Sequence, residues 1–218
     1  MAPGVRKVVG TDDSLMMLVQ ANYTEVHVTT HTPVTILGIP GSLRRGSYNR
    51  SALRVAQQLV PSRARLEVAE IGQLPLYNQD LEAEPPGTVA DFKRRIRGAD
   101  AVLFVTPEYN YSVPGVLKNA IDWASRPSGD SAWDGKPAAI MGASGGPIAT
   151  ARAQHHLRQM LVFLNMPALA RPEVMIGDAQ EKFDQNGNLI HDPTREGIRQ
   201  MLEGLVQWTL LLRRELPD

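Results

Sequence analysis

The chain of 218 residues contains no cysteine. This absence excludes disulfide bonds, thiolate-bound metals, iron–sulfur clusters and every mechanism that depends on a cysteine nucleophile. It is compatible with a reducing compartment, and we expect a cytoplasmic protein. A chain of this length, with 43% hydrophobic residues, can bury a sizeable core without metals or disulfides.

Long apolar runs and an excess of charge of one sign are also missing. The longest apolar stretches, such as residues 160–164, are far too short to span a bilayer. Lys plus Arg and Asp plus Glu both number 23. Nucleic-acid binders carry a basic surface and lipid-binding proteins a polybasic segment, so we expect neither nucleic-acid nor membrane partners. A neutral chain is permissive for self-association.

The hydrophobic pattern divides the chain at residue 33. Residues 1–32 show no convincing period and are interpreted as an N-terminal extension of unknown role. Residues 33–218 form one predicted domain, in which short apolar segments alternate with segments of helical period. Strands are predicted at 34–39, 66–71, 101–105, 138–141 and 169–176, and helices at 52–60, 88–98, 116–124, 153–164 and 194–212. This alternation predicts the α/β class, with a parallel sheet covered by helices on both faces.

Two local signals refine these elements. Thr88 and Asp91 have the spacing of a capping box at the start of their helix. Pro172 lacks an amide hydrogen and therefore places the last strand at an edge of the sheet. Open parallel sheets bind ligands beyond the carboxyl ends of their strands, and in the order 2-1-3-4-5 the site lies between the first and third strands. The loops after those strands are therefore the predicted site.

The loop after the first strand, residues 42–49, has the features of a phosphate site. It precedes a helix, whose free amide groups and dipole favour an anion. Ser42, Ser47 and Asn49 add neutral hydrogen-bonding groups, and Arg44 adds a charged fork suited to phosphate. The alternative is that Ser47 or Asn49 merely caps the helix. The loop matches neither the G-x-G-x-x-G dinucleotide pattern nor a Walker loop.

The loops after the third and fourth strands could complete such a site. Residues 107–115 carry two tyrosines, two prolines and a glycine, and rigid backbone with aromatic faces suits a flat heterocycle. The alternative is a rigid loop packed on its own tyrosines. Residues 144–146 include paired glycines, which allow a backbone to approach a ligand closely.

These motifs together resemble the NADPH-dependent FMN reductase family, and within it the chromate- and quinone-reducing members. The resemblance rests on G-S-L-R-R-G-S-Y-N at 41–49, L-P-L-Y-N-Q-D at 74–80 and P-E-Y-N-Y-S-V-P-G-V-L-K-N-A-I-D-W at 107–123. It covers residues 33–212. It implies a flavodoxin-like three-layer sandwich, whose five-stranded parallel sheet has the order 2-1-3-4-5.

The resemblance also implies bound FMN, with NADPH or NADH as electron donor. The cofactor-binding residues implied are Ser42, Leu43, Arg44, Ser47, Tyr48 and Asn49 in the phosphate loop, Pro107, Glu108, Tyr109 and Asn110 at the flavin ring, and Ser144, Gly145 and Gly146 at its pyrimidine end. Family members usually form dimers or tetramers, so we expect a homodimer or homotetramer. No catalytic side chain and no metal site is assigned.

The expected function follows from a bound flavin, which supplies the chemistry itself. Hydride would pass from NAD(P)H through FMN to a quinone or similar small acceptor by ping-pong kinetics. A flavodoxin-type electron carrier remains an alternative, although such carriers are usually strongly acidic. A non-catalytic flavin-binding module is the other alternative.

Several conspicuous side chains have simpler interpretations. Glu108 is either a general base or a partner of backbone or of an arginine at a subunit interface. Lys118 and Asp122 have the spacing of a helix ion pair, and Trp123 is interpreted as a packing or interface residue. The adjacent His155 and His156 would point about 100° apart on a helix, which disfavours a shared metal.

Overall fold

The computed structural model describes residues 33–213, so the extension predicted for residues 1–32 lies outside the described part. The elements, in chain order, are β1 (Val34–Pro40), α2 (Tyr48–Leu59), β2 (Ala64–Val68), the short 3-10 helix η1 (Gln79–Leu81), α3 (Gly87–Gly98), β3 (Ala101–Val105), α4 (Gly115–Ala124), β4 (Ala138–Ala143), α5 (Ala151–Phe163), β5 (Val174–Ile176), α6 (Ala179–Lys182) and α7 (Asp192–Leu212). Their alternation agrees with the predicted α/β class.

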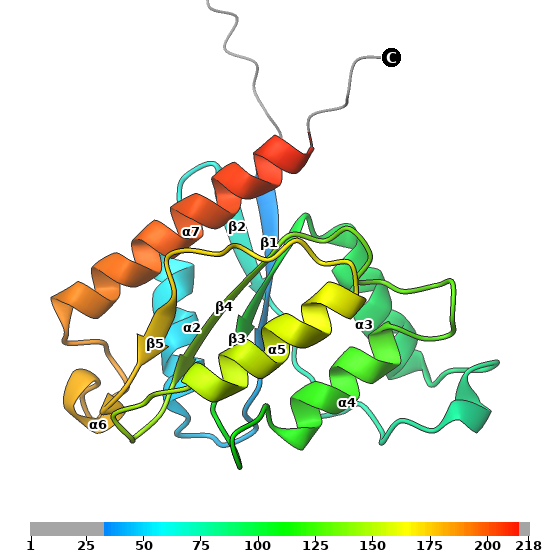
Figure 1. Ribbon diagram of the computed structural model, residues 1–218, viewed down its shortest axis with the longest axis horizontal. Helices are drawn as coiled ribbons and strands as arrows, with labels where there is room; N and C mark the ends of the chain where they lie inside the picture. Colours follow the sequence, from blue (N-terminus) through cyan, green and yellow to red (C-terminus); the bar gives the residue numbers. More distant parts are fainter. Residues whose placement is uncertain (1–32, 214–218) are drawn as a thin grey trace, which may run out of the picture. The chain divides into compact units, whose positions relative to one another are not determined.

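All five strands are parallel and form one sheet in the order β2-β1-β3-β4-β5, which confirms the predicted topology (Figure 1). The chain runs from β1 to one edge at β2 and then returns past β1 to β3. Every residue of β1, β3 and β4 is buried, as expected for strands covered on both faces. The reversal between β1 and β3 is the point at which such sheets bind ligands.

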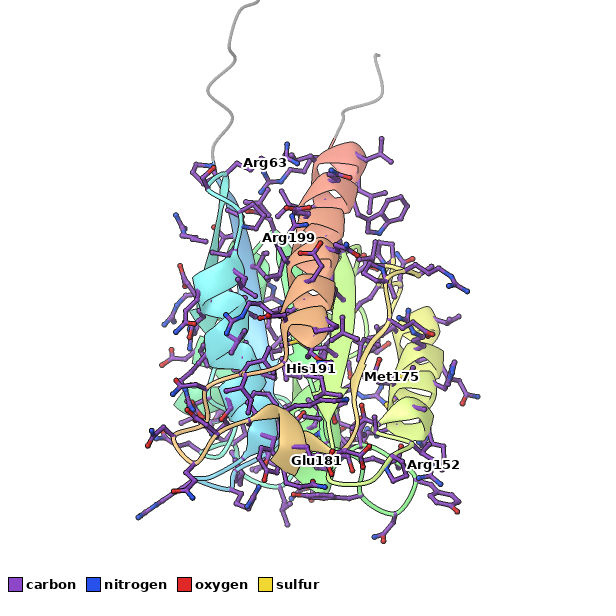
Figure 2. The ribbon with its side chains drawn as sticks, turned by 90° about the vertical axis from the view of Figure 1, so that its left-hand side faces the viewer. Arg63, Arg152, Met175, Glu181, His191 and Arg199 are labelled. Carbon is purple, nitrogen blue, oxygen red and sulfur yellow. The ribbon has the colours of Figure 1, made fainter. Side chains whose placement is uncertain are left out.

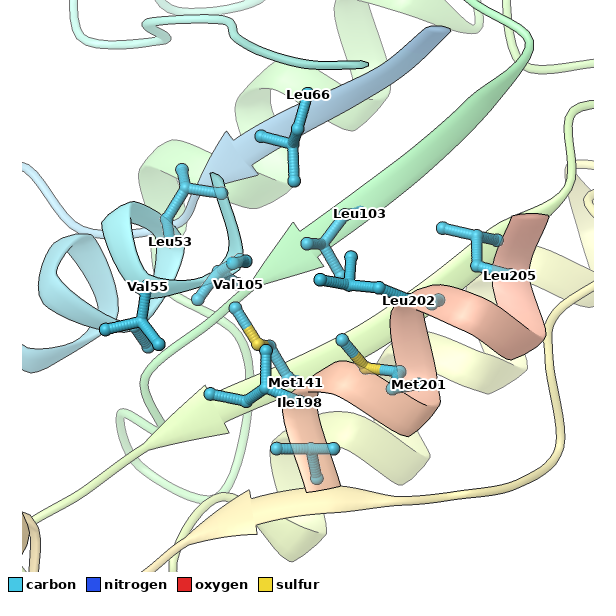
Figure 3. Packing of buried hydrophobic residues seen from close by; sticks show 14 of the residues in the cluster. Leu53, Val55, Leu66, Leu103, Val105, Met141, Ile198, Met201, Leu202 and Leu205 are labelled. Carbon is cyan, nitrogen blue, oxygen red and sulfur yellow. The ribbon is translucent and has the colours of Figure 1, made fainter. Parts of the chain in front are cut away.

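Helices cover both faces of the sheet. One apolar cluster joins it to α2 and α7, and the other joins it to α3, α4 and α5. Figure 3 shows the first cluster, in which Met201 and Leu202 of α7 lie near Leu103 of β3 and Met141 of β4. The residues predicted to face inward from the last helix are all buried: Ile198, Leu202, Leu205, Val206 and Thr209. Within residues 33–213, no helix has the length and apolar character needed to cross a membrane.

The last strand is at the predicted edge but is shorter than predicted. The chain first touches β4 where the Leu169 amide donates to the Ala138 carbonyl at 2.7 Å. It then leaves the sheet around Pro172, which has no amide hydrogen to donate. Regular pairing resumes only at Val174, opposite Met141. The single strand predicted at 169–176 is therefore an isolated contact followed by β5.

Other boundaries also differ from prediction, and two of these differences have a local cause. The capping box is wrong, because α3 begins at Gly87 with Pro86 at its N-cap and without a side-chain cap. The ring of Pro86 fixes its own φ angle, and the helix begins at the next residue, one position before Thr88. The second strand is Ala64–Val68 rather than 66–71, because its ladder with β1 begins at the Val34–Ala64 pair.

Candidate active site

The loop from β1 to α2 is held in shape by its own hydrogen bonds. Ser47 is the N-cap of α2, and its Oγ accepts the Asn49 amide at 3.2 Å. The buried Ser42 accepts the Arg44 amide through Oγ at 3.3 Å and the Arg50 Nε through its carbonyl at 3.0 Å. Arg50 also makes two hydrogen bonds to Glu70, which lower the pKa of that carboxyl. The anion-favouring start of α2 is thus preformed.

Asn49 connects this loop to the end of β4. Its side-chain Nδ2 donates to the Ala143 carbonyl and its Oδ1 accepts the Ala143 amide, both at 2.8 Å. The side chain is buried. Asn49 therefore holds the start of α2 against the end of β4, where the next loop begins.

Arg44 and Tyr48 lie together at the rim of this loop. The guanidinium carbon of Arg44 is 5.8 Å from the centre of the Tyr48 ring, and that ring is 5.6 Å from the ring of Phe183. The stack holds an exposed positive charge beside the start of α2. Leu43 differs, because its half-exposed side chain lies against Gly72.

The loop after β3 contains a tight turn. Tyr109 and Ser112 exchange two backbone hydrogen bonds of 2.9 Å. The central residues Asn110 and Tyr111 have φ values of 51° and 66°, the pattern of a type I′ turn. A bulky residue with positive φ is uncommon and persists only where surrounding contacts hold it.

Those contacts come from the first turns of α5. The side chain of Glu108 is almost fully buried, and its carboxylate accepts hydrogen bonds from the Arg152 side chain and the Ala153 amide. The Arg152 guanidinium stacks on Tyr111, 3.8 Å from the ring centre. Figure 2 shows Arg152 at the same end of the fold as Glu181 of α6 and opposite Arg63. No sequence signal identified Arg152, because only the tertiary fold brings α5 to this loop.

The loop after β4 begins where two backbones nearly touch. A Cβ atom on Gly142 would lie 2.2 Å from the Thr106 carbonyl oxygen. Beyond it, Ser144 Oγ accepts the Gly146 amide at 3.3 Å, and the Ser144 carbonyl accepts the Ala179 amide at 3.1 Å. The paired glycines are therefore held against the start of α6.

These three loops enclose two adjoining cavities. The first, of about 200 Å³, is lined by Ser42, Arg44, Ser47, Tyr48, Asn49, Pro107, Glu108, Tyr109, Ala143, Ser144 and Gly145. The second, of about 330 Å³, is lined by Glu108, Asn110, Tyr111, Ser144, Gly146, Pro147, Ile148, Ala149 and Arg152. Every site residue predicted from the sequence lines one of them except Leu43. The structure adds further lining residues that were not among the predicted site residues: Ala143, Pro147, Ile148, Ala149 and Arg152.

The segment at 74–80 has a structural place beside α4. Asn119 accepts the Tyr77 amide at 2.7 Å and donates to the Pro75 carbonyl at 2.8 Å. Trp123 also donates to Pro75 and contacts Tyr77 edge to face. The packing role predicted for Trp123 is confirmed, as is the ion pair of Lys118 with Asp122.

The fold and these loops define a flavodoxin-like protein with a site for a flat, phosphate-bearing cofactor. The donor set fits FMN, because serine hydroxyls, an arginine and a helix N-terminus can bind its phosphate. The proline- and tyrosine-bearing loop after β3 supplies the surface that a flavin ring requires. The family model of the NADPH-dependent FMN reductases matches residues 34–181, and the chain belongs to this family.

Individual relatives agree with the family. The chain is 56% identical over 181 residues to an NAD(P)H-dependent FMN reductase of Pseudomonas aeruginosa, covering 83% of this chain and 97% of the relative. It is 51% identical over 176 residues to a quinone reductase of Pseudomonas putida, covering 80% and 94%. The structure of FerB, a flavoenzyme NAD(P)H:(acceptor) oxidoreductase from Paracoccus denitrificans, has 39% identity and a TM-score of 0.76, covering 82% and 98%.

Proposed function

We propose that the protein transfers hydride from NAD(P)H, through bound FMN, to a quinone or a similar small acceptor. The observation that carries this proposal is the meeting of the two cavities at Glu108 and Ser144. One cavity has the groups that bind a phosphate, and the other is open, with Tyr111 and Ile148 exposed beside it. Relatives named quinone reductase and NADPH:quinone oxidoreductase support the acceptor class.

Each loop has a distinct role in this proposal. Ser42, Ser47 and Arg44 bind the phosphate with the first turn of α2. Pro107 and Tyr109 line the flavin ring, and the glycine backbone after Ser144 approaches its pyrimidine end. FMN supplies the hydride chemistry when it is bound. The protein's own groups bind, orient and shield the reactants, and no side-chain acid or base is required.

Steady-state kinetics test the single-site mechanism. Donor and acceptor use the same face of the cofactor in turn, so NADPH and a quinone should give parallel double-reciprocal lines. Excess quinone should inhibit competitively against NADPH. Intersecting lines, which indicate that both reactants are bound together, would contradict the proposal. Chromate can be assayed in the same way as a further acceptor.

We also propose that the protein is a cytoplasmic homodimer or homotetramer. The neutral chain has no cysteine, and its donor NAD(P)H is an intracellular reductant. Val162 and Phe163, at the end of α5, have exposed fractions of 82% and 83%, and adjacent exposed apolar side chains favour burial in an interface. Light scattering should give at least the dimer mass at micromolar concentration, and Phe163→Glu should lower it. A monomeric parent protein would refute this assembly.

A further inference from the structure

Glu108 has an unusual setting for a carboxylate at the edge of a cavity. Its side chain is only 5% exposed. One oxygen accepts Arg152 Nε at 2.5 Å, and the other accepts the Ala153 amide at 3.1 Å. The N-cap residue Thr150 makes no side-chain cap of its own to α5. A negative charge is stabilised at a helix N-terminus, so Glu108 takes the place of the missing cap from a different loop.

The same helix end holds the turn that follows Glu108. Arg152 stacks on Tyr111, whose φ is positive, and His156 Nδ1 lies 2.7 Å from Ser112 Oγ. Arg152 and His156 are four residues apart and therefore lie on one face of α5. Two contacts from one helix face thus fix the 109–112 turn, which carries Asn110 and Tyr111 at the wall of the second cavity.

We propose that Glu108 is a positioning residue for donor and acceptor, acting through Arg152 and the 109–112 turn. This inference rests on the proposed function. Both carboxylate oxygens are already engaged by an arginine and a backbone amide, so Glu108 acts on the wall of the cavity rather than on the reacting atoms. Its link to α5 holds Tyr111 at the wall of the second cavity, where the proposed function places NADPH and the quinone.

The substitution Glu108→Gln tests the link with little change in volume. A glutamine keeps one acceptor oxygen but turns an NH2 group toward the second donor, so one of the two contacts is lost. In the FMN-loaded protein, we expect KM for both NADPH and quinone to rise about 10-fold through misplacement of the wall. The limiting rate of flavin reduction at saturating NADPH should change less than about threefold, because the chemical step needs no side-chain base.

Two further variants locate the effect. The double variant Glu108→Gln, Arg152→Lys should raise KM little more than either single variant, because residues that act through one contact are not additive. Glu196→Gln is the matched control, since Glu196 is also held by an arginine, Arg199, but lies on α7. It should keep the kinetic constants of the parent. The visible circular dichroism of bound FMN should change in Glu108→Gln and not in the control.

The contrary outcomes are distinct. Loss of the limiting rate with unchanged KM would make the carboxylate a catalytic base, and unchanged KM and flavin dichroism would remove any positioning role. Additive effects of the two substitutions would exclude action through Arg152. If Glu108→Gln fails to load FMN, Arg152→Lys alone tests the link, and an unchanged KM in that variant contradicts the proposal. A parent protein that does not oxidise NADPH would instead refute the proposed function itself.

Discussion

Arg44 is the side chain that we propose contributes most directly to recognition of the cofactor phosphate. It is exposed at the rim of the first cavity and stacked near Tyr48. Arg44→Ala should weaken FMN binding by roughly 1.5–3 kcal/mol, the range for a charge-assisted hydrogen bond. Riboflavin, which lacks the phosphate, should bind to the parent protein far more weakly than FMN does. The affinity for riboflavin should not change in Arg44→Ala. Fluorescence titration with both flavins measures the difference.

Arg45 provides the control for Arg44. It is the adjacent arginine and is also exposed, but it does not line either cavity. Arg45→Ala should therefore leave FMN affinity nearly unchanged. Equal affinity of the parent for FMN and riboflavin would contradict a phosphate role for the whole 42–49 loop.

At position 142, neighbouring atoms leave room only for glycine. The methyl group of an alanine there would meet the Thr106 carbonyl oxygen at 2.2 Å and the Thr150 Oγ1 at 2.4 Å. Gly142→Ala should lower the free energy of unfolding by about 1–3 kcal/mol, as overpacking does. Gly197→Ala on α7 should instead raise the free energy of unfolding by about 0.5–1 kcal/mol, because alanine favours a helix. Apart from its chain neighbours and the backbone of its own helix, no described atom would lie within 4 Å of the added Cβ. Denaturant titration that found Gly142→Ala as stable as the parent would refute this account.

Side chains with ligand-binding chemistry were easier to single out from the sequence than side chains that hold the loops in place. Ser42, Ser47 and Arg44 were identified because serine and arginine before a helix have a recognisable chemistry. The roles of Asn49 toward β4 and of Arg152 toward Glu108 depend on partners that are 94 and 44 residues away in the sequence. The amino-acid sequence of a single protein gives no signal for contacts between residues so far apart in the chain.

At the scale of elements, two ion pairs connect the segment between α4 and β4 to α3. Asp130 accepts hydrogen bonds from the buried Lys93 and from Arg97, which lower the pKa of its carboxyl. A carboxyl whose pKa is lowered by folding contributes stability above its unfolded pKa and loses it as the pH falls through the folded pKa. The contribution should therefore be present at neutral pH and disappear in acid.

The substitution Asp130→Asn tests this contact. It should destabilise the protein by about 1 kcal/mol at neutral pH, since the carboxylate itself is largely exposed. The difference from the parent should shrink progressively below about pH 4. Asp91→Asn, which breaks an exposed pair with Arg94 on the same helix, should cost less at every pH. A difference for Asp130→Asn that grows on acidification would contradict the assignment.

Element types were predicted more accurately than element ends. The strands at 34–39 and 101–105 agree with β1 and β3 within one residue, because buried β-branched runs ended by proline have few alternatives. Prolines account for two of the boundaries that differ from prediction. Pro86 started α3 early, and Pro172 interrupted the last strand. In both places the backbone restriction of proline outweighed the side-chain pattern.

For the whole molecule, the sheet order converts separate motifs into one site. The loops after β1, β3 and β4 are far apart in the sequence but adjacent at the carboxyl edge, because β1 and β4 both pair with β3. This adjacency followed from the predicted order 2-1-3-4-5. The extent of the second cavity could not be predicted from the strand order, because it depends on where α5 begins.

The most direct test of the account is an anaerobic titration of the FMN-loaded protein. Because the site is proposed to pass hydride to the cofactor and then to an acceptor, about one molar equivalent of NADPH should bleach the visible absorbance of the oxidised flavin. Subsequent addition of a quinone should restore that absorbance. If NADPH leaves the flavin oxidised while a chemical reductant bleaches it, the protein is an electron carrier or a flavin-binding module, and the proposed reaction is wrong.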